Sequence, residues 1–391
     1  MDAIDNLLAR GVDRIYPDKK KLEALLRSGR KIKLYQGFDP SMPNLHLGNL
    51  VGLLKLRQFQ QLGHQVIFLI GDFTGMIGDP TDKFASRTRL TRRQVLDNAA
   101  AWEKQAGQIL DFKGSNRAKI IFNSRWNDRI TFRQLIEISA NFTVQQMLER
   151  DFYQRRLEQN KPIYLHEFLY PIAQAIDCVN LKVDLEIGGS DQTFNMLCGR
   201  TLMKAMEGKE KYVLTTKLLV DSRGQKVGKT SGNAFFLNLS AADMYGSVMS
   251  FPDDALPLAF ELLTELDPNR QPDQPLQAKK ILARQIVSLL HSPKVADRVQ
   301  TDWENVFQNR NLPAKISAIT TVRRKGDLAS LITEAKLAKS KSDAKRLIRQ
   351  GAVEVNGRVS NDPFADFSLN KPLTVKVGKH LFAKITHHDS D

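Results

Sequence analysis

The sequence predicts an α/β fold in which a doubly wound parallel sheet is followed by a helical domain and a small α+β domain. Three observations lead to this prediction. Short apolar runs alternate with helix-like segments over residues 1–232, which is typical of a parallel sheet covered by helices. Residues 233–322 then show a mostly helical pattern, and residues 326–391 show two short helices and a hairpin. We therefore expect three domains with these boundaries.

The first elements can be placed from apolar spacing. Residues 1–30 are predicted to be helical because apolar side chains recur three to four residues apart, at Leu7, Leu8, Val12 and Ile15. An apolar run at 32–38 ends in Gly37-Phe38-Asp39-Pro40, which is typical of a strand followed by a sharp turn. A helix-like segment at 47–62 closes at Gly63, and the next strand is predicted at 66–70.

Strand, helix and strand in this order predict a right-handed crossover between parallel strands. Further strands are predicted at 119–122, 183–187 and 213–220, with helical patterns between them. Doubly wound sheets of this kind bind nucleotides, and their ligands lie at the carboxyl ends of the strands. We therefore expect the functional side chains at that edge.

The rest of the chain reads as helices and then a compact tail. The proline-rich stretch 267–275 is predicted to be a connecting loop, and Arg323-Arg324-Lys325 a linker. In the tail, Ser340 to Asp343 resembles a capping box that opens a helix ending at Gly351. The pair Asn356-Gly357 predicts a tight hairpin turn.

The formal net charge of +15 allows two interpretations. Basic residues can simply be a solvated surface, or they can mark a polyanionic partner whose phosphates they neutralise. In the predicted tail helix the cations Lys341, Lys345 and Arg349 recur every four residues, with Arg346 close by, while Ala344, Leu347 and Ile348 form the apolar stripe. This clustering favours a contact with a phosphate backbone.

Cysteine content and hydropathy indicate a protein of the cytoplasm. Only Cys178 and Cys198 occur, without a metal-binding spacing, so neither a metal site nor a disulfide framework is expected. The N-terminal segment contains acidic residues and has the pattern of neither a secretory signal nor a transit peptide. No apolar run approaches the length of a membrane span, so no membrane association is expected.

Two motifs point to phosphate chemistry. The first, His46-Leu47-Gly48-Asn49, follows the first predicted strand and opens a helix, whose amino end attracts anions. His46 and Asn49 lie one turn apart, so both can donate to the same anion. The second is the loop at 221–233, where Lys226 and Lys229 lie among Gly, Ser and Thr residues and suit a departing pyrophosphate. Each motif alone also fits an ordinary surface turn or a solvated lysine loop.

Together, HLGN and KVGKT resemble the HIGH and KMSKS signatures of the class I aminoacyl-tRNA synthetases. The chain closely resembles the bacterial-type tyrosyl-tRNA synthetases over nearly its whole length, with further similar segments at 35–40, 78–80, 174–177 and 188–192. The resemblance implies activation of L-tyrosine with ATP and transfer to the 3′ end of tRNA(Tyr). It also implies ATP with Mg²⁺ as substrate, no tightly bound cofactor, and a cytoplasmic homodimer.

The resemblance also assigns residues to the amino acid. Tyr35 and Asp177 would converge on the phenolic hydroxyl of the substrate. A bound phenylalanine would leave a buried acceptor unpaired, and tyrosyl enzymes are the standard example of this discrimination. Tyr170, Gln174 and Asp79 would hold the α-ammonium, with Gln192 nearby. The spacing of Tyr170, Gln174 and Asp177 places them on one face of a helix.

For ATP, the resemblance implies binding by Asp39, Ser41, Gly48, Gly189, Asp191 and Lys229, with Asp191 suited to the ribose hydroxyls. His46 and Asn49 would meet the phosphates, and the catalytic loops would contribute Lys226, Lys229, Thr230, Lys83 and Arg87. The domains would then be a catalytic domain at 1–232, a helical anticodon-side domain at 233–322 and an S-four-type RNA-binding domain at 326–391. That last domain would contact tRNA through Lys341, Lys345, Arg346 and Arg349.

Two alternatives remain open. The spelling HLGN, with Asn49 in place of the second histidine of HIGH, is also common in tryptophanyl relatives, although Tyr35 and Asp177 favour a phenol over an indole. Ile176 also departs from the aromatic residue that many tyrosyl enzymes carry there. The second alternative is a non-catalytic RNA-binding protein on a synthetase scaffold, which the retention of His46 and the two lysines disfavours.

Overall fold

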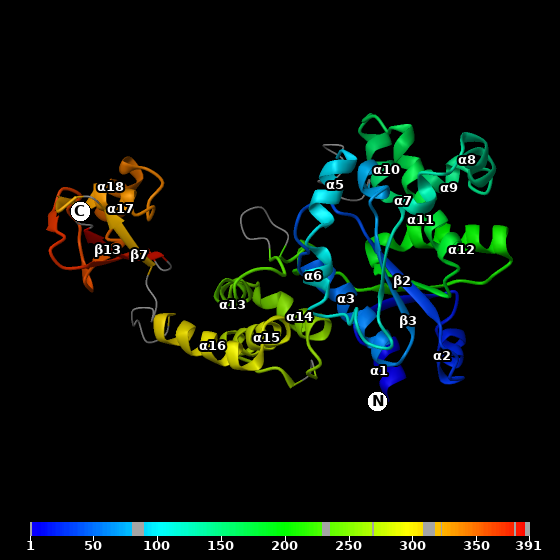
Figure 1. Cartoon of the computed structure of the whole chain (residues 1–391), viewed down its shortest axis with the longest axis horizontal. Coiled ribbons are helices and arrows are strands. Elements are labelled where there is room, and N and C mark those ends of the chain that lie inside the picture. The colour runs from blue at the N-terminus through cyan, green and yellow to red at the C-terminus, as the bar shows by residue number, and fades with distance from the viewer. Residues whose placement is uncertain are drawn as a thin grey trace. The chain divides into compact units, whose positions relative to one another are not determined.

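The computed structural model describes residues 2–79, 90–228, 235–267, 270–307, 317–321, 323–378 and 381–387. It divides into two compact units, Met1–Ala296 and Asp297–Asp391, each of which is described by itself (Figure 1). The predicted boundaries after residues 232 and 322 therefore stay predictions.

The N-terminal segment is not one helical stretch, so the prediction for residues 1–30 is wrong. Helix α1 (Ala3–Ala9) ends before strand β1 (Val12–Tyr16), and α2 (Lys19–Arg27) follows. Gly11, with φ +65°, provides the turn between α1 and β1. Val12 and Ile15 pair across an antiparallel ladder with Thr216 and Leu214. Pairing with a distant strand thus overrides the local helical spacing.

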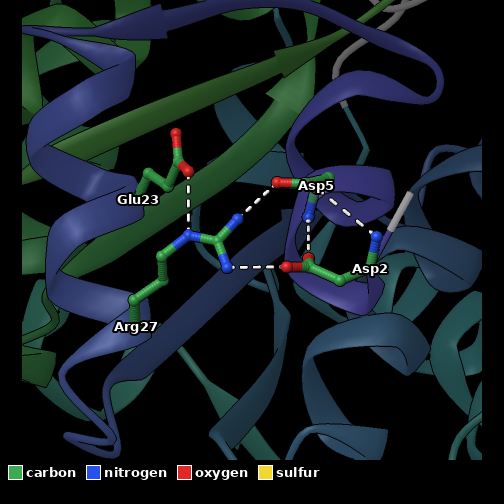
Figure 2. Close-up of polar contacts among 4 residues, drawn as sticks. All are labelled: Asp2, Asp5, Glu23 and Arg27. Atoms are coloured by element: carbon green, nitrogen blue, oxygen red, sulfur yellow. Dashed lines mark hydrogen bonds and ion pairs between the residues drawn. The ribbon is translucent and has the colours of Figure 1, made fainter.

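One arginine joins the two N-terminal helices, as Figure 2 shows. Asp2 caps α1 by accepting a hydrogen bond from the Asp5 backbone N–H at 2.8 Å. The Arg27 guanidinium of α2 contacts both Asp2, at 2.7 Å, and Asp5, and its Nε lies 2.8 Å from Glu23. All four side chains are at least a third exposed, so solvent screens the cluster and it adds little to stability.

The sheet of the first unit has the predicted doubly wound topology. Its strands are β2 (Lys33–Phe38), β3 (Gln65–Ile70), β4 (Lys119–Phe122), β5 (Leu185–Gly189) and β6 (Tyr212–Thr216). The order is β1-β6-β5-β2-β3-β4, and every pair except β1–β6 is parallel. From β2 the sheet continues to β3 and β4 on one side, and from β5 it continues to β6 and β1 on the other. The point between β2 and β5 is where such sheets bind ligands.

Helices cover the sheet and complete its core. Helix α3 (Leu47–Gln61) links β2 to β3, and α12 (Thr193–Glu207) links β5 to β6. On one face Tyr35, Ile67 and Leu69 pack in a cluster with apolar residues of α12 and of α11 (Leu165–Leu181). This cluster packs one face of the sheet against α11 and α12.

The remaining elements of the first unit are helical. Before α11 the structure has α4 (Thr74–Ile77), α5 (Arg92–Ala99), α6 (Trp102–Ala106), α7 (Ser124–Asn127), α8 (Phe132–Ser139), α9 (Val144–Leu148) and α10 (Asp151–Glu158). A 3₁₀ turn, η1 (Ser190–Gln192), precedes α12. After β6 come α13 (Ala241–Met249), η2 (Asp253–Ala255), α14 (Leu256–Leu263), α15 (Pro275–Leu290) and α16 (Pro293–Phe307), which runs into the second unit. This agrees with the helical pattern predicted for the region.

The second unit confirms the two tail helices and the hairpin and adds strands that the sequence analysis missed. Helices α17 (Leu328–Glu334) and α18 (Lys341–Arg349) precede β9 (Val353–Val355) and β10 (Arg358–Val359). Asn356 and Gly357 have φ +47° and +81°, as a type I′ turn requires. The missed strands are β7 (Ser317–Thr321), β8 (Lys325–Asp327), β11 (Asp366–Ser368), β12 (Leu373–Val377) and β13 (Leu381–His387). The predicted linker is wrong at Lys325, which begins β8.

Candidate active site

One of the predicted substrate-binding residues is a buried carboxylate. Asp177, on α11, is 2% exposed. Its Oδ1 accepts hydrogen bonds from Trp126 Nε1 at 2.8 Å and Asn127 Nδ2 at 3.1 Å, and its Oδ2 accepts one from Asn123 Nδ2 at 3.1 Å. Burial raises the pKa of Asp177 to about 8, against the opposing effect of the three N–H donors.

A chain of hydrogen bonds runs from Asp177 to the outer part of the site. Asn123 also donates to Thr74 Oγ1 at 3.0 Å, and Thr74 donates to Asp39 Oδ1 at 2.6 Å. Tyr170 donates its hydroxyl to the other oxygen of Asp39 at 2.8 Å. Because Asp39 follows β2 and Asn123 follows β4, the chain lies along the carboxyl ends of the strands.

Tyr35 is the second residue predicted to contact a phenolic hydroxyl. It lies in the same apolar cluster as Ile176 and Cys178, which flank Asp177. Its side chain is fully buried, and its hydroxyl has no hydrogen-bond partner within the described residues. Burial and the nearby carboxylates of Glu186 and Asp177 raise the pKa of Tyr35 well above its ordinary value. The hydroxyl is therefore un-ionised.

A buried ion pair lies next to Tyr35 in the sheet. Glu186 of β5 is the register partner of Tyr35 in β2, and its carboxylate pairs with Lys211, which directly precedes β6. Gln174 donates its Nε2 to Glu186 Oε1 at 2.9 Å. Burial alone would lower the pKa of Lys211, but Cys178 and Glu186 outweigh it and the pKa is raised. Lys211 is therefore charged.

Asp79 and Gln192, both predicted near the substrate ammonium, contact each other. Gln192 donates its Nε2 to Asp79 Oδ2 at 2.5 Å, and Asn195 of α12 donates to Gln192 Oε1 at 2.9 Å. Asp79 is 9% exposed. The structure thus brings two predicted substrate-binding side chains from the segment after β3 and the turn after β5 into direct contact.

The HLGN segment forms a capped helix start. His46 is the N-cap of α3: its Nδ1 accepts a hydrogen bond from the Gly48 backbone N–H at 3.0 Å, and Asn49 Oδ1 accepts one from the His46 backbone N–H at 2.9 Å. With Nδ1 acting as an acceptor, the neutral imidazole carries its proton on Nε2. The Asn49 amide likewise keeps its N–H groups for donation. Imidazole and amide N–H groups of this kind are donors that an anion can accept.

Phe235 links the two signature motifs, although the sequence separates them widely. The Leu47 backbone N–H donates to the Phe235 carbonyl at 3.0 Å, and Phe235 in turn donates to the Gly228 carbonyl at 3.0 Å. Lys226 Nζ lies 2.7 Å from Asp191 Oδ2, and both side chains are partly exposed. Lys83, Arg87, Lys229 and Thr230 lie outside the described residues.

Two of the residues predicted to contact the nucleotide, Gly48 and Gly189, are glycines whose backbone lies close to other side chains. A Cβ at Gly48 would lie 2.9 Å from the His46 ring, and one at Gly189 would lie 2.6 Å from Asp191 Oδ1. Ser41 is exposed in the loop after β2, and its backbone N–H donates to the Asp39 carbonyl at 2.8 Å. These positions fit a ligand that lies against the backbone.

The sequence analysis missed the residues that hold the predicted ones in place. They are Thr74, Asn123, Trp126, Asn127, Glu186 and Lys211. The position of Asn123 immediately after β4 is a signal that could have been used, because ligand groups gather at strand ends. The role of Lys211 has no local signal, since it depends on a glutamate in another strand.

In the second unit, α18 buries Ala344 and Ile348 and keeps its cations accessible. Lys345 Nζ lies 4.6 Å from the centre of the Phe364 ring, and Arg346 pairs with Asp343 at 2.6 Å. Lys341 lies 3.6 Å from Asp327. The four predicted RNA-binding cations thus lie on one short helix, and three of them are already oriented by neighbours in the same unit.

Large apolar side chains are exposed on the segment between the two halves of the sheet. They occur on α8, α9 and the start of α11, with exposed fractions of 78% at Phe132, 66% at Val144 and 77% at Leu165. Exposure of this kind marks surfaces that contact other proteins.

Within the residues described above, no group of three or more His, Cys, Asp or Glu side chains has a metal-holding arrangement. No helix in that part is long and apolar enough to span a bilayer.

Comparison with known families gives two matches. A family described as class I tRNA synthetases (W and Y) matches residues 27–308, and the S4 domain matches residues 328–363. Individual relatives extend the similarity over most of the chain. The tyrosine–tRNA ligase of Moorella thermoacetica is 40% identical over 97% of this chain and 94% of its own length. That of Aquifex aeolicus is 39% identical over 94% and 95%.

Solved structures share the fold. A C-terminally truncated mitochondrial tyrosyl-tRNA synthetase of Coccidioides posadasii superposes with a TM-score of 0.63 at 24% identity, covering 77% of this chain and 92% of that one. The Archaeoglobus fulgidus tyrosyl-tRNA synthetase, in complex with L-tyrosine, superposes with a TM-score of 0.58 at 18% identity, covering 77% of this chain and all of that one.

Proposed function

The chain belongs to the class I tRNA synthetases, and within them to the tyrosine–tRNA ligases, and on this premise we propose which residues carry each step. The enzyme activates L-tyrosine with ATP to tyrosyl-adenylate and transfers the tyrosyl group to the 3′ end of tRNA(Tyr). The tyrosine carboxylate attacks the α-phosphate of ATP, and the terminal ribose of the tRNA then attacks the adenylate carbonyl.

Tyr35 and Asp177 read the phenol of the substrate. The observation that carries this assignment is a buried tyrosine hydroxyl without a partner in the described residues, in the same cluster as the flanks of a buried carboxylate. Asp177 Oδ2 receives one N–H donor where Oδ1 receives two, so it has capacity for another. Phenylalanine would leave the buried Tyr35 hydroxyl without a partner and the remaining acceptor capacity of Asp177 unused, which penalises its binding.

Tyr170, Gln174, Asp79 and Gln192 hold the substrate ammonium. The support for this role is that each side chain is held by a polar partner: Tyr170 by Asp39, Gln174 by Glu186, and Asp79 and Gln192 by each other. Carboxylate and amide oxygens are the acceptors that an ammonium group needs. Each of these side chains is oriented by a partner, so little rearrangement is required on binding.

ATP lies over the start of α3, against Asp39, Ser41, Gly48 and Gly189, with its ribose at Asp191. The helix amino end and the donors of His46 and Asn49 favour the phosphates. Lys226, with Lys229, Thr230, Lys83 and Arg87, neutralises the pyrophosphate as it leaves. Catalysis then consists of positioning and charge stabilisation, without a protein nucleophile. Mg²⁺ arrives with ATP as part of the substrate, and no tightly bound cofactor takes part.

The domains divide the work with tRNA. A catalytic domain at 1–232 carries the chemistry, a helical domain at 233–322 lies on the anticodon side, and the RNA-binding domain at 326–391 contacts phosphates through Lys341, Lys345, Arg346 and Arg349. The match to the S4 domain and the accessible cations of α18 support this assignment.

The enzyme works as a homodimer in the cytoplasm. The exposed Phe132, Val144 and Leu165 support a second copy as the partner, because a lone soluble chain would gain from covering them. Their location in the first unit agrees with dimerisation through the nucleotide-binding domain.

Amino-acid-dependent exchange of labelled pyrophosphate into ATP tests the activation step without tRNA. We expect exchange with tyrosine and little with phenylalanine or tryptophan. Asp177→Asn should lower the ratio of kcat/KM for tyrosine to that for phenylalanine, while the exposed control Glu210→Gln should leave the ratio unchanged. Exchange with tryptophan alone would keep the fold and overturn the phenol assignment. Absence of exchange with any amino acid would favour the RNA-binding scaffold instead.

A further inference from the structure

A buried ion pair adjoins the residues proposed to hold the substrate. Glu186 is 1% exposed and Lys211 is fully buried. Lys211 Nζ contacts Glu186 Oε2 and also donates to the Met196 carbonyl at 3.1 Å. Removing two charges from water is costly, and apolar residues of similar volume often serve stability as well. The position of the pair therefore calls for a functional explanation.

The pair fixes the orientation of one amide. Gln174 donates its Nε2 to Glu186 Oε1 at 2.9 Å. An ionised carboxylate accepts hydrogen bonds and cannot donate them. The reverse orientation of the amide would set its oxygen against the carboxylate oxygen. With its nitrogen bonded to Glu186, Gln174 presents its oxygen as an acceptor without a hydrogen-bond partner among the described residues, and an acceptor is the group an ammonium requires.

The surrounding structure makes room for this arrangement. A Cβ at Gly199 of α12 would lie 2.7 Å from Lys211 Nζ and 3.3 Å from Glu186 Oε2. The absence of a side chain at Gly199 therefore leaves space beside α12 for the ammonium of Lys211 to reach the carboxylate. Because Glu186 is also the register partner of Tyr35, the same carboxylate adjoins a group proposed for each end of the bound tyrosine.

We propose that Glu186, ion-paired with Lys211, is a positioning residue for the substrate ammonium. It holds the amide of Gln174 with its oxygen turned toward the substrate, and Gly199 provides the space in which Lys211 can do this. This inference rests on the proposed role of Gln174 in tyrosine binding.

Glu186→Gln tests the inference. The new amide nitrogen would face Gln174, so the Gln174 amide would turn round and direct its N–H groups at the substrate ammonium. Loss of one hydrogen bond to a charged group corresponds to an increase of about tenfold or more in KM for tyrosine. We expect KM for ATP and kcat to change little, because the lost contact is equal in the ground and transition states.

Two inhibitors of the exchange reaction isolate the ammonium contact. Tyramine has the phenol and the ammonium, whereas 3-(4-hydroxyphenyl)propanoate has the phenol and no ammonium. In Glu186→Gln the Ki of tyramine should rise in parallel with KM for tyrosine, and the Ki of the propanoate should stay within about twofold of wild type. Equal changes for both inhibitors, or no change for either, would overturn the inference.

A matched control and a second variant complete the test. Glu261→Gln removes another carboxylate bonded to a lysine, since Lys217 Nζ lies 2.8 Å from Glu261 Oε1, and it should leave both Ki values unchanged. Glu186→Gln combined with Lys211→Met removes both charges and should show the same selective loss if the single variant does not fold. Thermal melting followed by circular dichroism establishes folding. Absence of tyrosine-dependent exchange in the wild type would instead overturn the proposed function.

Discussion

Tyr35→Phe is expected to stabilise the free protein and at the same time weaken tyrosine binding. The hydroxyl of Tyr35 is fully buried and has no hydrogen-bond partner within the described residues. A buried polar group without a partner costs about 1–3 kcal/mol. Removing the hydroxyl, with little change of shape, should therefore raise the free energy of unfolding by about 1 kcal/mol or more. The melting temperature should rise by about 2–4 °C for each kcal/mol in a domain of this size class.

The same substitution removes one hydrogen bond to the substrate phenol. A neutral hydrogen bond is worth about 0.5–1.5 kcal/mol, which corresponds to an increase of about two- to twelvefold in KM for tyrosine. The KM for phenylalanine should fall or stay constant, because that substrate no longer leaves the hydroxyl unsatisfied. Urea denaturation of the free enzyme and steady-state pyrophosphate exchange measure the two effects separately.

Tyr153→Phe is the matched control. Tyr153 of α10 is also fully buried, with a hydroxyl that has no partner in the described residues. Its removal should stabilise the protein without changing KM for tyrosine. If Tyr35→Phe lowered the free energy of unfolding by about 1 kcal/mol or more, the hydroxyl would have a partner in the free protein and the reasoning would be refuted.

Four further outcomes are expected. Lys211→Met should lower the free energy of unfolding by about 3–5 kcal/mol, because it leaves the buried charge of Glu186 unpaired, and adding Glu186→Gln should restore most of that free energy. Urea titrations that gave equal losses for the single and the double variant would contradict this expectation. The pKa of Asp177 is raised to about 8, so the buried carboxyl favours folding at low pH. The free energy of unfolding of wild type, relative to that of Asp177→Asn, should therefore fall from pH 4 to 8 by up to about 1.4 kcal/mol per pH unit. A difference between the two proteins that stayed constant in denaturation curves at several pH values would argue against the raised pKa. Leu165→Asp should shift sedimentation velocity profiles toward monomer, and an unchanged profile would place the dimer contact elsewhere. Arg349→Ala should weaken tRNA binding and reduce the salt slope by about one, with an unchanged slope in filter-binding titrations excluding a phosphate contact.

Local patterns were sufficient to predict the parallel sheet and the two signature motifs. The predicted strands at 119–122 and 66–70 agree with β4 and β3 to within one residue, because buried parallel strands are continuous apolar runs bounded by turns. The hairpin at Asn356-Gly357 also follows from local chemistry, since both residues accept a positive φ.

Elements that depend on distant partners could not be predicted in this way. Val12 and Ile15 have helical spacing, yet they pair with β6, whose residues lie about 200 positions later in the chain. In the tail, β13 pairs in parallel with β7 from the beginning of the unit, and this pairing gives no short-range signal. Predictions from spacing therefore fail where a ladder closes over a long loop.

In the candidate site, too, some residues could be predicted from local sequence and others could not. Side chains expected to touch substrates occur in recognisable segments, but those that orient them are scattered. Trp126, Thr74 and Lys211 are unremarkable in the sequence, and each acquires its role through a bond to a residue in another element. A single sequence contains no statement of such pairings.

The hydrogen bonds of Asp177 also set a limit for redesign of the pocket. An engineer who wished to admit a different amino acid would first think of replacing Asp177, yet three N–H groups from Asn123, Trp126 and Asn127 converge on its two oxygens. A small apolar residue there would leave all three donors without an acceptor. Through Thr74 the disturbance would reach Asp39, which we propose as a nucleotide contact. A library that varies this carboxylate alone would thus return mostly damaged enzymes, whereas one that varies it together with Asn123 and Trp126 could rebuild a satisfied pocket of new shape.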